Sequence, residues 1–468
     1  MPPRRKNGKK PNLPPSAKTE QQRLAEIKSK LKIKVLEKNK GKTICLTMIV
    51  KNESKIIKRL LDSLIGVVDM ISIVDTGSDD NTEEIILNWG KEHDIPTTVH
   101  HEPFRNFGYN RSHSIQAAKE TYPNADYLLL SDADFIWVVD PKKFNKKLLF
   151  EDKFLIKQVS DYNHYWNIRM LSAKLEWHCV GVTHEYWDEK PDQGKVTSGY
   201  INSLKINDIE DGGSKGDKYE RDFRLFTEAF KTEEDESLIG RYKFYYAQTL
   251  KCMKKYKEAI VAYQEKIDYK INNYQETFHS WYSIGECRKS IYYGIENCIE
   301  YMEKREKYQA EQIQIQNGIE VEKPIGELKE WQEKHISYYN PDNLGVSELK
   351  KMLEDQIPVI HKAYIDAHEN RTTRIEPIYR LTEFYRKMGK NKEAHELIMK
   401  YGFDLKMDDR DLFVEYQCYD YLFDYELSIV GFYVDKDAGY DAELRLLDRD
   451  DLPNYIRKVV ERNAKHYI

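Results

Sequence analysis

The sequence predicts an α/β domain built on a mostly parallel sheet, followed by an all-α domain of helical repeats. Apolar strand patterns alternate with amphipathic helix patterns between residues 43 and 130, and from about residue 217 one helix pattern follows another. The chain has 468 residues, which suits two or three domains with separate cores. We therefore expect a tail over residues 1–42, the α/β domain over 43–216 and the helical domain over 217–468.

The first half alternates strands and helices in the order typical of a parallel sheet covered on both faces. The expected strands are 43–50, 70–74, 97–100 and 127–130, and the expected helices are 53–64, 82–93 and 110–120. Ligands of such sheets bind beyond the carboxyl ends of the strands. Polar residues gather at these ends: Lys51, Asn52, Glu53, Asp75, Thr76, Gly77, Ser78, Asp132 and Asp134.

The second half repeats the apolar spacing of tetratricopeptide helical hairpins. We expect hairpins over 241–267, near 281–302 and over 377–399, with a Glu-, Lys- and Gln-rich helical insertion near 303–350. A purely structural helical domain and a peptide-binding solenoid both fit this pattern.

Charge separates the tail from the rest of the chain. Residues 1–42 carry 14 Lys and Arg against 3 Asp and Glu, a balance of +11, which leaves 60 against 76, or −16, for the remainder. With several prolines and few apolar residues, this predicts disorder passing into a polar helix near 20–36. We expect a solvated extension and not nucleic acid as a partner; a role of the tail in binding nucleic acid or an acidic surface is the alternative.

Targeting signals and metal-binding cysteine patterns are not found in the sequence. No early segment resembles a signal peptide and no run of about 18 apolar residues occurs, so we expect a cytoplasmic protein without a membrane span. The six cysteines lack C-x-x-C or Cys/His spacing, which argues against zinc sites and a disulfide framework.

The tripeptide Asp132-Ala133-Asp134 directly follows the apolar run 127–130. Two carboxylates at the end of a buried strand can hold a divalent cation such as Mg²⁺ or Mn²⁺, which takes oxygen ligands. Two acids in a solvated turn are the alternative, and only the preceding order of elements favours the metal.

Four segments occur in a characteristic order: Leu46–Glu53, Ile73–Thr82, Tyr109–Ser112 and Asp132–Asp134. Together they resemble glycosyltransferase family 2, of GT-A fold, over roughly residues 43–200. A wider likeness, to family 2 transferases fused to tetratricopeptide repeats, adds 217–222, the first hairpin and 374–377.

The resemblance implies a hexosyltransferase that uses a nucleotide-sugar donor, usually a UDP-sugar, with Mn²⁺ or Mg²⁺ holding the diphosphate. It gives the nucleobase to Asp75, the nucleoside pocket to Glu53 and the backbone near Val50, and the donor phosphates to Arg111. Glu53 could instead cap a helix N-terminus, and Arg111 could be a surface residue.

The remaining implied roles concern the metal, the base and a lid. Asp132 is assigned mainly to the ribose and also to the metal, while Asp134 and a later histidine, His184, are metal ligands. Inverting transfer needs a general base, for which Glu185 or Asp188 is the candidate. A glycine-rich stretch precedes Lys218 and Arg221, which predicts a lid over the diphosphate; an interdomain linker is the alternative.

Three functions are compatible with these features. The first is a metal-dependent, inverting transfer of a sugar to a protein, peptide or oligosaccharide acceptor. The second is a non-catalytic helical-repeat binding module that carries a degenerate nucleotide-sugar fold. A nucleotidyltransferase is disfavoured because residues 50–54 contain no glycine for a triphosphate loop.

Overall fold

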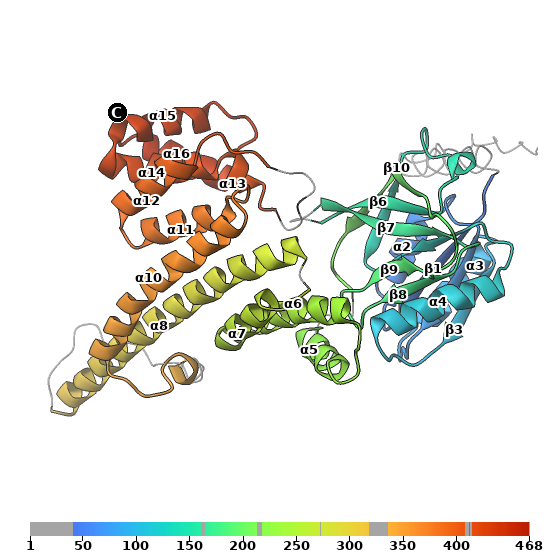
Figure 1. Cartoon of the computed structure of the whole chain (residues 1–468), viewed down its shortest axis with the longest axis horizontal. Coiled ribbons are helices and arrows are strands. Elements are labelled where there is room, and N and C mark those ends of the chain that lie inside the picture. The colour runs from blue at the N-terminus through green and yellow to red at the C-terminus, as the bar shows by residue number, and fades with distance from the viewer. Residues whose placement is uncertain are drawn as a thin grey trace, which may run out of the picture. The chain divides into compact units, whose positions relative to one another are not determined.

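The computed structural model describes residues 41–160, 164–212, 218–271, 273–317, 336–407, 411 and 414–467 (Figure 1). The expected basic tail lies outside these residues except for Gly41 and Lys42, and the same holds for the middle of the expected insertion. Contacts between residues divide the chain into two compact units, Met1–Lys218 and Tyr219–Ile468.

The described part of the first unit contains one eight-stranded sheet with the order β3-β2-β1-β4-β7-β6-β10-β5. Its strands are β1 (Ile44–Val50), β2 (Met70–Asp75), β3 (Thr97–His101), β4 (Tyr127–Leu130), β5 (Phe135–Val139), β6 (Lys153–Val159), β7 (His164–Ser172) and β10 (Ser198–Asp208). The first four in the spatial order are parallel, and β7 pairs antiparallel with both β4 and β6. The parallel half confirms the predicted α/β fold.

Helices cover both faces of the parallel half. The helices α2 (Ile57–Ser63) and α3 (Thr82–Glu92) pack on one face, where Leu60 and Trp89 join one apolar cluster. The helix α4 (Phe107–Thr121) packs on the other face with the ribbon of β8 (Trp177–Val180) and β9 (Tyr186–Glu189). Each fully buried large aliphatic side chain contributes about 1.5–3 kcal/mol, so these clusters fix the sheet and with it the strand ends.

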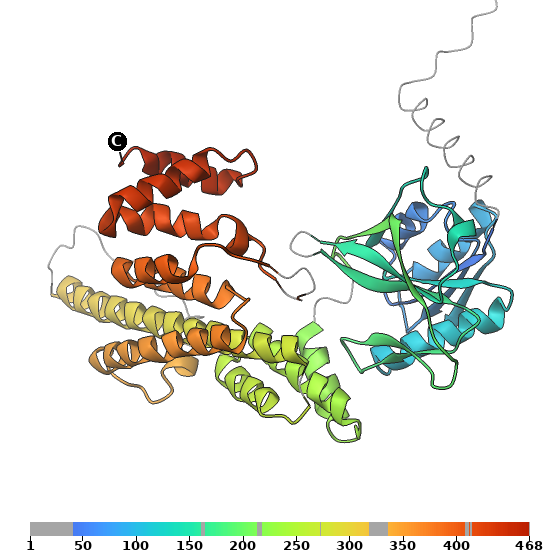
Figure 2. The same cartoon turned by 45° about the horizontal axis from the view of Figure 1, so that its top comes forward.

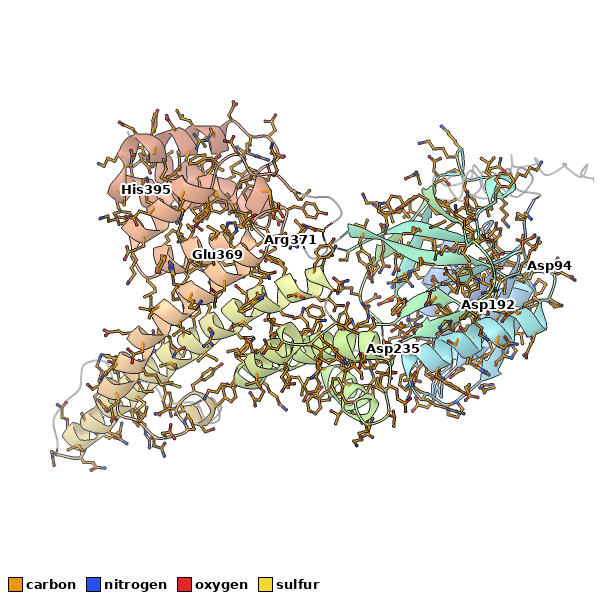
Figure 3. The ribbon with its side chains drawn as sticks, in the orientation of Figure 1. Asp94, Asp192, Asp235, Glu369, Arg371 and His395 are labelled. Carbon is orange, nitrogen blue, oxygen red and sulfur yellow. The ribbon has the colours of Figure 1, made fainter. Side chains whose placement is uncertain are left out.

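The described second unit is helical throughout (Figure 1). Its helices are α5 (Lys218–Ala229), α6 (Glu236–Cys252), α7 (Tyr256–Ile267), α8 (Tyr274–Gln316), α10 (Val346–Asn370), α11 (Glu376–Lys387), α12 (Asn391–Tyr401), α13 (Gln417–Asp420), α14 (Leu422–Val434), α15 (Lys436–Leu447) and α16 (Asn454–Ala464). Asp235, labelled in Figure 3, caps the N-terminus of α6, because its carboxylate accepts the amides of Ser237 and Leu238.

The hairpins predicted over 241–267 and 377–399 are present as α6 with α7 and α11 with α12. The hairpin predicted near 281–302 is wrong, because α8 runs unbroken through that segment beside α10, in yellow and orange in Figure 2. A Cβ at Gly285 would lie 2.7 Å from the Tyr364 ring, and one at Gly294 would lie 2.2 Å from that of Tyr339. Gly285 and Gly294 are therefore sites of close packing within α8.

None of the described helices combines the length and apolarity needed to cross a membrane.

Candidate functional site

The parallel strands end together at one edge of the sheet. Val50 lies opposite Asp75, and Asp75 lies opposite His101, so β1, β2 and β3 finish at the same level. β4 pairs with β1 on its other side and ends at Leu130, opposite Thr47. The loops after these strands therefore share an edge, as the sequence predicted.

The loops after β1 and β2 are fastened to each other. The Asn52 amide donates to Ser78 Oγ at 2.9 Å, the Asp79 amide donates to Asn52 Oδ1 at 2.9 Å, and the Glu53 amide donates to Thr82 Oγ1 at 2.8 Å. Asn52 takes a φ of +56°, in the left-handed region that asparagine tolerates better than most residues. The two loops thus form one rigid wall.

Asp75 ends β2 with its side chain 4% exposed. Its Oδ1 accepts the amides of Gly77 at 2.8 Å and Ser78 at 2.7 Å, which closes a turn around Gly77 at a φ of +112°. Asp75 therefore holds the turn with one oxygen, and none of the described residues donates a hydrogen bond to the other, Oδ2.

Arg111, Asp132 and Glu185 meet in one cluster. Arg111 Nη2 donates to Asp132 Oδ1 at 2.6 Å, and its Nε lies 2.7 Å from Glu185 Oε1. The Arg111 side chain is 15% exposed, so both ion pairs are partly shielded from water. The sequence predicted all three residues in the site but not that they pair with one another.

The cluster continues through residues that the sequence analysis missed. Arg169 of β7 donates from Nη1 to Asp132 Oδ2 at 3.2 Å and from Nη2 to Gln158 Oε1 at 2.8 Å. Gln158 of β6 in turn donates from Nε2 to Asp208 Oδ2 at 2.8 Å, at the end of β10. An arginine between Ile168 and Met170 in an apolar strand was the available signal, since a buried charge needs partners.

The opposite charges in this cluster favour the ionised forms of Asp132 and Arg111. Burial opposes ionisation of Asp132, but the neighbouring Arg111 and Arg169 outweigh it and lower the pKa of the carboxyl. Burial likewise opposes the charge on Arg111, while Asp132 and Glu185 raise its pKa. The charged forms therefore persist together at neutral pH.

Helix α4 carries Arg111 and is anchored at its first turn. Asn106 accepts the Tyr109 amide, and the amides of Phe107 and Gly108 donate to Val182 and Gly181 carbonyls at 3.0 and 3.1 Å. Amides of a first helical turn have no partner inside the helix, so the loop after β8 satisfies them. This docking fixes Arg111 relative to Glu185, which follows the same loop.

Asp134 and Glu53 face a common space beside Gly212. A Cβ added at Gly212 would lie 3.3 Å from Asp134 Oδ2 and 3.6 Å from Glu53 Oε1. The preceding residue, Asp211, makes a two-bond ion pair with Arg59 of α2 at 2.6 and 2.7 Å. That ion pair places Gly212 against the two carboxylates, and Arg59 was also missed by the sequence analysis.

The other predicted residues lie as follows. His184 has a φ of +51°, and Asp188 lies in β9 opposite His178 with its Oδ1 accepting the Glu189 amide at 3.1 Å. The Val50 carbonyl accepts the amide and hydroxyl of Thr76 at 2.9 and 3.0 Å, so it supports the wall.

Lys218 begins α5 with an exposed side chain. Arg221 belongs to the second unit, where its Nε lies 3.5 Å from Asp222 Oδ1. The roles of both residues at a diphosphate stay predictions.

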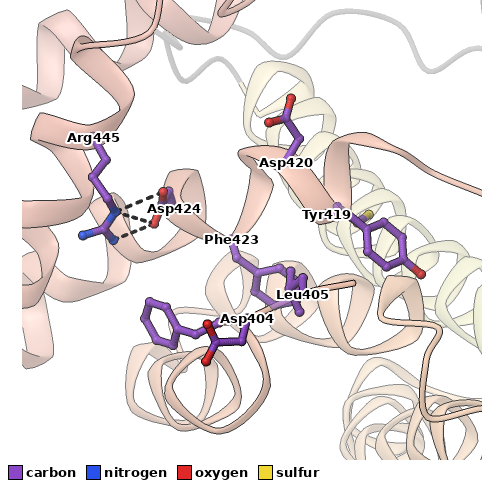
Figure 4. Close-up of a pocket in the computed structure, with 10 residues that line it drawn as sticks. Asp404, Leu405, Tyr419, Asp420, Phe423, Asp424 and Arg445 are labelled. Carbon is purple, nitrogen blue, oxygen red and sulfur yellow. Dashed lines mark hydrogen bonds and ion pairs between the residues drawn. The ribbon is translucent and has the colours of Figure 1, made fainter. Parts of the chain in front are cut away.

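A cavity of about 360 Å³ lies in the second unit (Figure 4). Phe403, Leu405 and Phe423 contribute its apolar wall, and Arg445 lies at its side in an ion pair with Asp424 at 2.6 Å. It contains no residue of the sheet unit.

Residues 45–146 match the family model described as Glycosyl transferase family 2. The chain carries a family 2 glycosyltransferase domain. The matched segment includes the two fastened loops, Arg111 and the Asp132-Ala133-Asp134 motif, and the parallel sheet agrees with the GT-A fold expected of this family.

The chain is also similar to crystal structures of TarS from S. aureus. For TarS 1–349 the identity is 12% and the TM-score 0.25, over 52% of this chain and 80% of that one. For the same protein in complex with UDP the identity is 14% and the TM-score 0.27, over 53% of this chain and 80% of that one. For its complex with UDP-GlcNAc the identity is 13% and the TM-score 0.25, over 53% of this chain and 81% of that one. No curated protein matches the chain.

A family 2 glycosyltransferase is expected to use a divalent cation, and two parts of the site differ in how well they fit one. Asp132 fits poorly as a ligand, because each of its oxygens bonds a guanidinium. Asp134 fits better, since its Oδ2 and Glu53 Oε1 are hard oxygen donors beside a residue without a side chain. The described residues contain no group of three or more His, Cys, Asp or Glu side chains arranged for a metal, so donor phosphates would have to complete the coordination.

Proposed function

We propose that this protein transfers a sugar from a UDP-sugar to a hydroxyl or other nucleophile, with a divalent cation at Asp134. The observation that carries the proposal is the convergence of Arg111, Asp132 and Asp134 at the carboxyl edge of the sheet, inside the segment that matches family 2. A guanidinium and a cation site at one edge suit a diphosphate, which brings two negative groups.

The nucleoside is bound at the wall formed by the loops after β1 and β2. Asp75 Oδ2 accepts the N–H of the base while Oδ1 holds the turn. Arg111 binds a phosphoryl oxygen through Nη1, because Nη2 and Nε are engaged by Asp132 and Glu185.

Asp134 and Glu53 would hold the cation, which when bound supplies Lewis-acid stabilisation of the departing diphosphate. His184 is a further candidate ligand on the loop that anchors α4. The chain's own contribution is to fix these carboxylates next to Gly212 through the Arg59–Asp211 pair.

The general base is Glu185 or Asp188, as inversion requires a carboxylate on the face opposite the leaving group. Glu185 is the nearer to Arg111 and hence to the expected diphosphate. Asp188 is fixed on β9 and has no ion pair among the described contacts, which leaves it suited to accept a proton.

The acceptor is a protein, peptide or oligosaccharide. Stacked helical pairs such as α6 with α7 and α11 with α12 form extended surfaces in repeat proteins, which supports a peptide acceptor.

The decisive experiment measures UDP release from a panel of UDP-sugars, with and without a chelator. We expect turnover of one donor, loss of turnover with chelator, and a fall of about 100-fold or more in Asp134→Asn. Asp192→Asn is the matched control, since Asp192 is exposed, lies in a loop at a φ of +69° that asparagine accepts, and is labelled in Figure 3. Turnover that survives both the chelator and Asp134→Asn would refute the cation's role, and a chain that turns over no donor would leave the helical unit as a binding module.

A further inference from the structure

We propose that Arg169 is a positioning residue of the donor site, which fixes Asp132 so that Asp132 presents Arg111 to the donor diphosphate instead of binding the cation itself. The inference rests on the proposed function and extends it to a residue outside the segment that matches family 2. It also changes the role of Asp132, for which the resemblance implied contacts to ribose and metal.

Arg169 is held in a fixed geometry. Its side chain is 10% exposed, its guanidinium lies 4.7 Å from the centre of the Phe135 ring, and Nη2 donates to Gln158. Gln158 is 3% exposed, and its amide is oriented because Oε1 accepts from Arg169 while Nε2 donates to Asp208. Strands β5, β6 and β10 therefore each contribute a group that holds this guanidinium of β7, directly or through Gln158.

The Asp132 carboxylate is shared by two guanidinium groups. Oδ1 accepts from Arg111 at 2.6 Å and Oδ2 accepts from Arg169 at 3.2 Å, so the carboxylate lies between two cations. A carboxylate shared in this way has little charge left for a divalent ion. With Arg169 on Oδ2, Arg111 bonds through Nη2 to a single oxygen, which sets the direction of its other nitrogens.

Arg169 also balances the charge of the cluster. Arg111 and Arg169 face Asp132 and Glu185, two cations against two anions, in a partly buried cluster. Without Arg169 the cluster would carry a net negative charge at the place where a diphosphate is expected, and Asp132 could take Arg111 through both oxygens. Both changes weaken diphosphate binding, whereas neither acts on the wall that holds the nucleoside.

The experiment measures binding of UDP and of uridine to the full chain by calorimetry and ligand-observed NMR, with Mn²⁺ and with chelator. In Arg169→Gln we expect UDP to bind about 10- to 100-fold more weakly in both conditions, the range typical for loss of a group that orients a ligand-binding residue. Uridine affinity should stay unchanged, because Asp75 and its turn are untouched. Arg105→Gln is the matched control, since Arg105 is 61% exposed and pairs with Glu102 at the surface.

A double-mutant cycle shows whether Arg169 acts through Asp132. If it does, Arg169→Gln added to Asp132→Asn should weaken UDP binding further by no more than about twofold, because the shared partner is already lost. Three outcomes would overturn the inference. The first is a double mutant in which the two losses of UDP affinity multiply. The others are wild-type UDP affinity in Arg169→Gln and a loss of uridine affinity equal to that of UDP. If Arg169→Gln does not fold, Arg169→Lys replaces it: lysine keeps the charge without the planar fork, and wild-type UDP affinity in that variant would overturn the inference.

The two proposals fail in different ways. If the wild-type protein binds no UDP, the proposed function is refuted. If the wild type binds UDP but Arg169→Gln binds it equally well, only the role of Arg169 is refuted.

Discussion

At the scale of single residues, the two carboxylate oxygens of Asp75 have different surroundings. The resemblance implied that Asp75 binds the nucleobase. The geometry gives one oxygen to the turn, and the other has no donor among the described residues. An acid at a strand end can have a structural and a functional role at once, because its two oxygens can accept different hydrogen bonds.

Two substitutions separate these roles. Asp75→Asn keeps an oxygen for the Gly77 and Ser78 amides, so we expect little change in stability, but its NH₂ group would meet the base N–H and weaken UDP binding about tenfold or more. Asp75→Ala removes both functions and should also cost about 1–2 kcal/mol in the free energy of unfolding. Urea unfolding and UDP titration of both variants check this, and an Asn variant with wild-type affinity for UDP would contradict it.

The site residues divide by what the sequence can reveal. Arg111, Asp132 and Asp134 could be found because each belongs to a short segment with its own pattern. Arg169, Gln158 and Asp208 could not, since they meet only through the order β7-β6-β10 and the register of those strands, which the sequence does not state.

At the scale of elements, the docking of α4 on the loop after β8 positions the cluster. A Cβ at Gly108 would lie 2.3 Å from the Gly181 carbonyl oxygen and 2.9 Å from that of Cys179. Both contacts are with backbone, so neither can move aside as a flexible side chain would. The close approach of α4 to this loop therefore requires glycine.

We expect Gly108→Ala to push α4 away from the loop, at a cost of about 1–3 kcal/mol in the free energy of unfolding. Because Arg111 moves with the helix, UDP affinity should also fall. Gln116→Ala, at an exposed position of the same helix, is the control and should change neither quantity by much. Thermal unfolding and UDP titration test this, and wild-type UDP affinity in a destabilised Gly108→Ala would show that α4 does not position Arg111.

Helices and strands were predicted correctly where the sequence pattern is local, and incorrectly where packing between distant segments sets the length of a helix. The strands and helices up to residue 130 were found within a few residues, because alternating elements have distinct periods. The unbroken α8 was missed because the apolar spacing that predicted a hairpin does not show where a helix ends. Gly285 and Gly294 admit the rings of Tyr364 and Tyr339, and these contacts are visible only in the structure.

At the scale of the whole molecule, the two units have separate apolar cores. One cluster belongs to the sheet and its helices, and another is built from residues of α8, α10, α11 and later helices. Separate cores allow separate unfolding transitions. The order of an α/β unit before a helical unit was readable from the sequence, because the change of period at about residue 217 spans long segments.

UDP should therefore stabilise one transition and not the other. At a concentration 100 times its Kd, a ligand adds about 2.7 kcal/mol to the unit that binds it. Calorimetric unfolding with and without UDP and Mn²⁺ should show one peak moving to higher temperature. A shift of both peaks by the same amount would indicate that the units unfold as one.

Acid should act on the helical unit through His279 of α8. Burial, with the nearby charges of Lys251 and Arg374, lowers the pKa of His279 to about 3, whereas an unfolded histidine titrates near 6.5. As pH falls below 6.5 the unfolded chain takes up a proton that the folded chain refuses, so stability present above that pH is lost. The loss should reach about 1–2 kcal/mol at pH 5.

Comparison of wild type with His279→Gln at pH 7.5 and pH 5 tests this. Glutamine does not titrate, so the loss between the two pH values should shrink in the transition that UDP leaves unmoved. His466→Gln, at an exposed site of the same unit, should retain the wild-type loss. Equal losses in the wild type and His279→Gln would mean that His279 is protonated in the folded unit, since a group that titrates alike in both states contributes nothing to the pH dependence.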